Sequence, residues 1–165
     1  MLRMILDLIK ALRRNHSLEH ATAAVLAGKM KPGTRIAGRA TIGGFHIYGN
    51  ISNEEVTQAA REGLARLKNG EHDLAVSPFC GTNLVASAVL AGLSSFLVLR
   101  SSKKNRNLHT AILASLIALV IAQPIGRLVQ KHLTTSSDIA SVNITEISTS
   151  GKGRLTHHKI TTLQG

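Results

Sequence analysis

The chain has few aromatic residues and few acidic ones. Its 165 residues include no Trp, one Tyr and three Phe, and nine Asp and Glu stand against twenty Lys and Arg, giving a formal net charge of +11. Modules that bind RNA or single-stranded DNA stack bases on aromatic side chains, and no recognised nucleic-acid motif is present. We therefore expect no nucleic-acid partner and attribute the positive charge to membrane topology and anionic lipid headgroups.

Cysteine is nearly absent as well. The single Cys80 excludes an intrachain disulfide, so cysteine usage does not indicate the redox compartment. Three interpretations of Cys80 stay open: a metal ligand, a nucleophile with His72 as the nearest base, or a small apolar residue at the entrance of a helix.

Charged residues are missing altogether from two long apolar stretches, residues 82–99 and 108–126. Each is close to or above the roughly 18 residues that cross a bilayer as a helix, so the pair predicts a transmembrane helical hairpin. The alternative is a buried hairpin in a soluble core. The rest of the chain is too short to cover two such helices on all sides, which favours the bilayer as partner.

Small residues recur at four-residue spacing in both stretches, a pattern that lets helix backbones approach closely in lipid. We therefore expect close packing of the two helices, or of copies of the protein in a homo-oligomer. The residues are Ser87, Ala91 and Ser95 in the first stretch, and Ala114, Ala118 and Ala122 in the second.

The positive-inside rule gives no clear topology, because basic residues flank both ends of the hairpin. The residues of the connecting loop are Arg100, Lys103, Lys104 and Arg106, and those near the outer ends are Arg66, Lys68, Arg127 and Lys131. The chain begins without a signal-peptide pattern, since Asp7 interrupts its apolar start. We therefore expect a multi-pass membrane protein with both termini in the cytoplasm.

Outside the apolar stretches the sequence predicts an α+β fold in three parts: an N-terminal domain over residues 1–80, the hairpin over 81–129, and a linker with a C-terminal β-hairpin over 130–165. The β-like segments of the third part are residues 140–148 and 155–163. No internal repeat or low-complexity segment stands out.

Within the N-terminal part, residues 2–13 have the apolar spacing of an amphipathic helix, either a membrane-surface helix or one that docks on a small core. Asn15 or Ser17 is expected to cap a second helix that ends near Gly28. Alternating residues over 34–42 predict a strand that returns after a glycine turn.

A capping box begins the next predicted helix. Ser52 is followed three residues later by Glu55, and Asn69-Gly70 is typical of a helix end. Residues 71–76 are then predicted to form a short strand.

The motif with chemical potential is His16-Ser17-Leu18-Glu19-His20. Residues four apart share a helix face, so His16 and His20 could bind one metal ion, with Glu19 as the general base that takes a proton from metal-bound water. The alternative is structural: a carboxylate favoured in the first turn of a helix, beside two ordinary histidines.

A catalytic zinc site usually takes three protein ligands, so a third is needed. The candidates are Glu55, Glu62, Glu71, His72 and Cys80. Glu62 is our first choice because a helix holds it rigidly, and Glu71 is the second. Glu55 is already explained by the capping box, and Glu62 could instead pair with Arg66.

Two resemblances rest on these motifs. Asn15-His16-Ser17-Leu18-Glu19-His20 and Cys80-Gly81-Thr82-Asn83, both ahead of an apolar hairpin, resemble a family of small bacterial membrane proteins without an established activity, which implies the bacterial cell membrane as location. The pentapeptide alone is similar to that of the inverted-motif zinc metallopeptidases of the insulinase and pitrilysin type. That likeness implies zinc on His16 and His20 and a basic role for Glu19.

The sequence thus leads to two hypotheses. The first is a membrane-anchored metal-binding protein, a zinc-dependent peptidase or other hydrolase with Glu19 as its base. The second is a non-enzymatic membrane scaffold or assembly factor that binds lipid and protein partners.

Overall fold

The computed structural model describes residues 1–31, 34–101, 108–151, 153 and 156–165. The chain forms two compact units, one of Met1–Ser77 with Leu133–Gly165 and one of Pro78–His132. Three of the basic residues used to weigh topology, Lys103, Lys104 and Arg106, lie outside the described residues.

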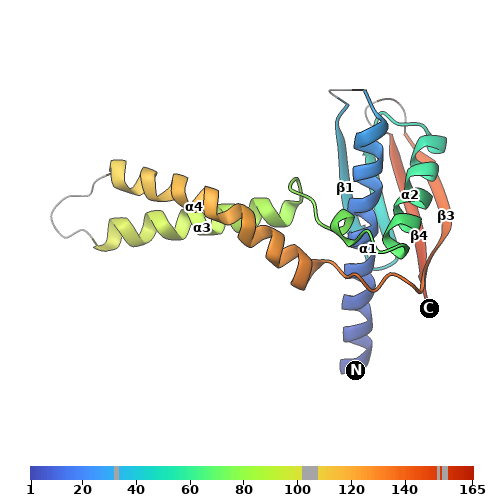
Figure 1. Cartoon of the computed structure of the whole chain (residues 1–165), viewed down its shortest axis with the longest axis horizontal. Coiled ribbons are helices and arrows are strands. Elements are labelled where there is room, and N and C mark those ends of the chain that lie inside the picture. The colour runs from blue at the N-terminus through green and yellow to red at the C-terminus, as the bar shows by residue number, and fades with distance from the viewer. Residues whose placement is uncertain (32–33, 102–107, 152, 154–155) are drawn as a thin grey trace. The chain divides into compact units, whose positions relative to one another are not determined.

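The first unit contains a four-stranded antiparallel sheet in the order β1-β2-β4-β3 (Figure 1). Its strands are β1 (Ile36–Thr41), β2 (Gly44–Gly49), β3 (Val142–Ser150) and β4 (His157–Gln164). Both predicted hairpins are present, and β2 pairs with β4. The C-terminal hairpin therefore belongs to the same sheet as the N-terminal one, which differs from the expected separate part over residues 130–165.

Close strand pairing explains one of the glycines in this sheet. Gly44 has φ +146°, and a Cβ there would collide with the carbonyl oxygen of Ile160 on the neighbouring strand. A side chain at this position would therefore disturb the pairing of β2 with β4.

Helix α1 (Leu2–Lys29) is one continuous helix of 28 residues, so the prediction of two helices is wrong. The expected caps bond elsewhere: the Asn15 amide donates to the carbonyls of Thr41 and Ile42 at 2.8 and 2.9 Å, and the Ser17 hydroxyl donates to the carbonyl of Ser136 at 2.8 Å. Their partners lie in distant segments. As a result, the His16–His20 motif sits in mid-helix rather than in a first turn.

Helix α2 (Asn53–Lys68) confirms the predicted capping box. The Ser52 hydroxyl accepts from the Glu55 amide at 3.2 Å, and the Glu55 carboxylate accepts from the Ser52 amide at 2.8 Å. Gly70, with φ +93°, follows the helix end.

The predicted strand over residues 71–76 is wrong. The segment is a short 3₁₀ helix, η1 (His72–Ala75), closed by bonds from the Leu74 amide to the Glu71 carbonyl and from the Val76 amide to the Asp73 carbonyl. Bonds across three residues, rather than to a neighbouring strand, satisfy this backbone.

One hydrophobic core lies between the sheet and the helices α1 and α2. Its fully buried members include Leu18 of α1, Val56 of α2, and Phe45, Ile47 and Ile160 of the sheet. Because Leu18 lies inside the His16–His20 motif, the core fixes the rotation of α1 at that motif.

The second unit is a helical hairpin of α3 (Gly81–Ser101) and α4 (Leu108–Val129), and the π-helix η2 (Gln130–Thr134) follows α4 in the chain. Both α3 and α4 are long and apolar enough to cross a membrane. Small residues pack them together: the Ser115 hydroxyl donates to the Ala91 carbonyl at 3.3 Å and hydrogen-bonds with the Ser95 hydroxyl. This confirms the expected small-residue packing at Ala91 and Ser95.

Candidate metal centre

His16, Glu19 and His20 lie together in the middle of α1. The two imidazole rings have centroids 4.3 Å apart, and their ligand nitrogens lie within 4.8 Å of one another. His20 and Glu19 are 4% and 8% exposed. The predicted convergence of the two histidines is therefore present, because mid-helix geometry places residues four apart on one face.

Each imidazole is held by a hydrogen bond from its Nδ1 atom to a backbone carbonyl. His16 Nδ1 lies 2.9 Å from the Thr134 oxygen, and His20 Nδ1 lies 2.7 Å from the Ala75 oxygen. A carbonyl oxygen only accepts, so both rings carry a proton on Nδ1. In the neutral tautomer, the lone pair is then on Nε2, which is the arrangement that orients metal-binding histidines in proteins.

The Glu19 carboxylate stands beside this pair. Its Oε2 atom lies 3.9 Å from His16 Nε2. The lone pair of a neutral imidazole and a carboxylate are both electron-rich, so a cation near both groups is electrostatically favoured. The structural alternative for Glu19, a charge in the first turn of a helix, does not hold in mid-helix.

A glycine in β1 makes room for Glu19. A Cβ atom at Gly38 would collide with Oε1 of the Glu19 carboxylate. Gly38 has no positive φ, so close approach rather than backbone conformation accounts for it. No local sequence pattern indicates this role of Gly38, because it depends on the packing of β1 against α1.

The carboxylates predicted as third ligand are engaged elsewhere. Glu62 Oε2 lies 2.6 Å from Lys29 Nζ, and Glu71 Oε2 lies 2.6 Å from Arg66 Nη2. The hydrogen bond from Arg66 lowers the pKa of Glu71. Among the described residues, the fold thus brings His16, Glu19 and His20 together and does not bring Glu62 or Glu71 to them.

Cys80 belongs to the second unit and precedes the first residue of α3. Within that unit the Thr82 amide donates to Cys80 Sγ at 3.4 Å. Along the chain, Cys80 follows Ala75, the residue whose carbonyl holds His20, by five positions.

A second group of histidines was missed by sequence reasoning. His46 Nδ1 and His157 Nε2 lie 2.7 Å apart across β2 and β4, and Tyr48 stacks on His157 with ring centroids 4.8 Å apart. Burial, and then the charges of His157, Lys159 and Arg39, lower the pKa of His46. Because surrounding positive charge disfavours a bound cation, this group is a poor metal site. Its residues are 111 positions apart, so no local spacing reveals it.

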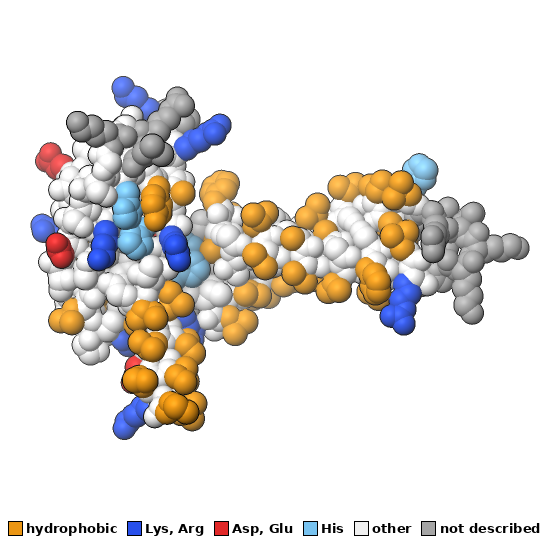
Figure 2. Space-filling model, turned by 180° about the vertical axis from the view of Figure 1, so that it is seen from behind, with side chains coloured by type: hydrophobic (Ala, Val, Ile, Leu, Met, Phe, Trp, Pro, Cys, Tyr) orange, Lys and Arg blue, Asp and Glu red, His pale blue; other side chains and the backbone are white. Residues whose placement is uncertain are grey.

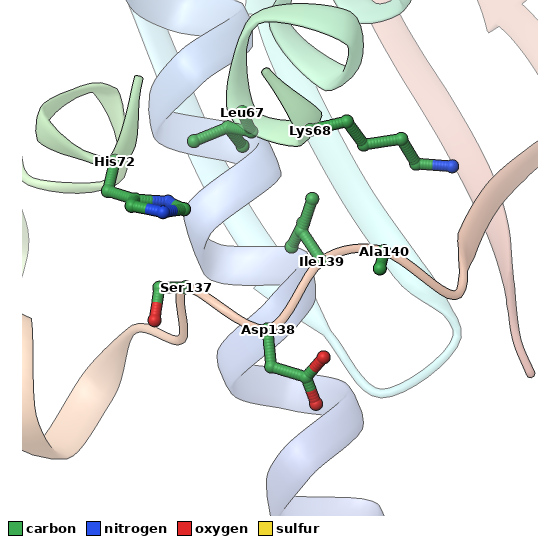
Figure 3. A pocket seen from close by; sticks show the side chains of 7 residues that line it. All are labelled: Leu67, Lys68, His72, Ser137, Asp138, Ile139 and Ala140. Carbon is green, nitrogen blue, oxygen red and sulfur yellow. The ribbon is translucent and has the colours of Figure 1, made fainter. Parts of the chain in front are cut away.

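The first unit also has an open hollow of about 240 Å³ (Figure 3). It is lined by Leu67, Lys68, His72, Ser137, Asp138, Ile139 and Ala140. It contains no residue of the His16–His20 motif, and Arg14 already pairs with Asp138. We therefore do not assign the candidate chemistry to it.

Comparison with known proteins places the chain in a family. Residues 11–147 match the family described as "Domain of unknown function (DUF6391)", and the chain belongs to it. An uncharacterized protein of the cyanobacterium Picosynechococcus sp. (strain PCC 7002) is 31% identical over 137 residues, which cover 76% of this chain and 66% of that relative. The chain thus matches a little less than two thirds of the relative's length. No solved structure matches this chain.

Proposed function

We propose that this protein is a membrane-anchored metal-binding protein that holds a divalent cation, zinc in the first instance, on His16 and His20. One observation carries the proposal: both imidazoles donate from Nδ1 to backbone carbonyls, at 2.9 and 2.7 Å. Each bond fixes the tautomer and the ring orientation, so both Nε2 atoms serve as ligands.

The third ligand in this proposal is Cys80. Thiolate and imidazole together are a usual ligand set for zinc. Chain connectivity limits how far Cys80 can lie from Ala75, whose carbonyl is hydrogen-bonded to His20: five residues of extended chain cover up to about 17 Å. Cys80 therefore replaces Glu62 and Glu71, whose carboxylates form ion pairs with Lys29 and Arg66.

For the reaction at this metal site, we propose hydrolysis of an amide or peptide bond. A bound zinc ion would supply the Lewis acidity that polarises a carbonyl and activates water. Glu19 takes the proton from that water as its oxygen attacks the carbonyl carbon, and it then delivers the proton to the leaving amine nitrogen as the carbon–nitrogen bond breaks. The position of Oε2, 3.9 Å from His16 Nε2, supports this role.

Membrane anchoring by α3 and α4 is the second part of the proposal. Large apolar side chains cover the outer surface of this hairpin, including Phe96 and Leu116 at 56% and 55% exposure (Figure 2). Lipid tails are the natural partners of such a surface. A multi-pass arrangement with both termini in the cytoplasm stays a prediction.

The same surface favours the runner-up function, a non-enzymatic scaffold or assembly factor. A metal closed by four protein ligands would serve such a protein structurally, whereas a catalytic site keeps one position open. The two functions differ in what Glu19 does, since only the enzyme needs its carboxylate for proton transfer.

Elemental analysis of detergent-purified protein tests the metal. We expect about one zinc per chain in the wild type and a loss of at least tenfold in occupancy in His16→Ala and His20→Ala. His109→Ala, a change at an exposed histidine of α4 that is no candidate ligand, is the matched control and keeps the metal. Wild-type protein without stoichiometric metal, in buffers free of chelator, contradicts the proposal.

Glu19→Gln separates the enzyme from the scaffold. This variant keeps the shape of the side chain and removes its basicity, so we expect retained metal and a fall of about 10²–10⁴-fold in hydrolysis of a casein or peptide-library substrate. Gly38→Ala is a second probe, because the three nearest atoms that its Cβ would meet all belong to the Glu19 side chain. Hydrolysis by Glu19→Gln at the wild-type rate excludes Glu19 as the base.

A further inference from the structure

The beginning of α1 carries a large apolar surface that the first unit leaves uncovered. Figure 2 shows the projecting end of the unit covered with apolar side chains. Residues 1–12, here called the N-terminal arm, have the following large apolar side chains at 40–97% exposure: Met1, Leu2, Met4, Ile5, Leu6, Leu8, Ile9 and Leu12.

The arm ends where α1 joins the body of the unit. The Arg13 guanidinium donates to the Thr135 carbonyl at 2.7 and 3.0 Å, and Arg14 pairs with Asp138. From Asn15 onward most side chains of α1 are buried, up to Leu26. One continuous helix therefore has a docked part and an uncovered part.

The shape of the apolar surface indicates its partner. At 100° per residue, the apolar side chains of the arm cover an arc of about 200°, and Arg3, Asp7 and Lys10 occupy the remainder. A second copy packed as a coiled coil would use a narrow seam, met here by Leu2, Ile5, Ile9 and Leu12. It would leave Met4, Leu6 and Leu8 in water, whereas a bilayer surface covers the whole arc.

The length and the charges of the arm indicate how it would contact a bilayer. Arg3, Asp7 and Lys10 interrupt the apolar residues of the arm at three positions. Twelve helical residues also measure about 18 Å against the roughly 30 Å of a hydrocarbon core, so residues 1–12 suit the surface of a bilayer rather than its interior. A helix with a wide apolar face and basic residues opposite lies in the interface, with its cations among anionic headgroups. Arg3 and Lys10 are the cations that would face the headgroups.

We propose that the N-terminal arm lies in the surface of an anionic bilayer, with Ile5 and Ile9 among the acyl chains. The proposal rests on the membrane anchoring by α3 and α4 proposed above, which brings the arm to a bilayer. It extends that function, because His16 follows Leu12 by one helical turn, about 6 Å along the axis. The metal site is thereby held close to the lipid surface, where a substrate at or emerging from the membrane would meet it.

The sequence contains no Trp, so single Trp substitutions allow a direct test in the whole 165-residue chain. Single variants Ile5→Trp, on the apolar arc, and Asp7→Trp, on the opposite side, are placed one chain per nanodisc made of phosphatidylglycerol and phosphatidylcholine. Phosphatidylcholine with brominated acyl chains then quenches any Trp at that depth. Phe96→Trp reports whether α3 itself is inserted.

We expect bromolipid to quench Ile5→Trp and Phe96→Trp at least about twofold more than Asp7→Trp. Adding Arg3→Glu and Lys10→Glu to the Ile5→Trp variant should weaken its quenching only in discs that contain phosphatidylglycerol. Equal quenching at positions 5 and 7, with Phe96→Trp quenched, overturns the arm proposal and leaves the anchor intact. Loss of quenching at position 96 contradicts the anchor instead.

Discussion

The two units of this protein distribute their apolar residues in opposite ways. Phe45, in the first unit, is fully buried, whereas Phe96, in the second, is 56% exposed. In the described part of the second unit the buried hydrophobic residues are small, namely Ala111 and Ala122. The first unit is built to exclude water from a core, and the second packs its backbones closely and presents apolar side chains outward. The difference fits the membrane anchoring proposed above, with water around the first unit and lipid around the second.

The two units also differ in how they hold polar side chains, which decides where a ligand site can form. The first unit buries polar side chains and satisfies them with distant backbone groups, as the bonds of Asn15, Ser17 and His20 show. Such networks hold side chains in one orientation, which a ligand site requires. The described part of the second unit contributes helix surface and, through Cys80, one potential ligand.

The largest effect is expected from a matched pair of phenylalanines. Phe45→Ala removes a fully buried ring from the core and should destabilise the first unit by about 3–5 kcal/mol. Phe96→Ala removes a ring from an exposed surface and should change that stability by less than about 0.5 kcal/mol. Urea unfolding in detergent, followed by hydrogen exchange of the strand amides, measures both. Equal losses would remove the distinction between the units.

A charge placed on the second unit tests its solvent. Leu116 is 55% exposed near the middle of α4, and Leu116→Arg should oppose bilayer insertion by about 2.5–3.5 kcal/mol. Leu116→Val, which stays apolar, is the control. The measurement is the inserted fraction of α4 in a microsomal insertion assay. Unchanged insertion of the arginine variant would argue that α4 does not lie in lipid.

A smaller effect is expected from pH. It concerns the stability of the first unit, which contains His158. Burial lowers the pKa of His158 below its ordinary 6.5, partly offset by a hydrogen bond to the Ile51 carbonyl. The unfolded chain then binds the proton more readily than the folded one, so stability falls as pH drops below about 6.5 and the fall ends near the folded pKa. Urea midpoints between pH 7.5 and pH 5 measure this slope.

His158→Gln supplies the control for that slope. Glutamine cannot titrate, so the variant should be less stable throughout but show a weaker decline between pH 7.5 and pH 5. His46, whose pKa is also lowered, accounts for part of the remaining slope. A decline as steep as in the wild type would assign the pH dependence to other groups.

Local chemistry made several elements predictable. The capping box at Ser52 and Glu55 and the glycine at position 70 bound α2 as expected, because caps act within a few residues. The limits of α1 were missed for the opposite reason: Asn15 and Ser17 are good caps by type, yet their partners are Thr41 and Ser136, which only the tertiary fold brings near. The pairing of β2 with β4 was likewise beyond any local pattern.

For the candidate site, too, local spacing was predictable and tertiary partners were not. The spacing of His16 and His20 predicts that their rings converge on one helix face, and they do. The carbonyls that fix them come from residues 55 and 118 positions away, and the space for Glu19 comes from Gly38. The choice of Glu62 rested on residue type and on the rigidity of a helix, neither of which reveals tertiary partners. Ion pairs with basic neighbours occupy the carboxylates of both Glu62 and Glu71.

X-ray absorption at the zinc edge of the purified 165-residue protein tests directly whether His16 and His20 bind the metal. We expect imidazole scattering from two nitrogen ligands at about 2.0–2.1 Å and one sulfur at about 2.3 Å. His16→Ala and His20→Ala should each lose most of the zinc absorption together with the metal, and Cys80→Ser should remove the sulfur while the imidazoles remain. A spectrum without imidazole scattering, unchanged by His16→Ala and His20→Ala, would contradict a metal site on α1.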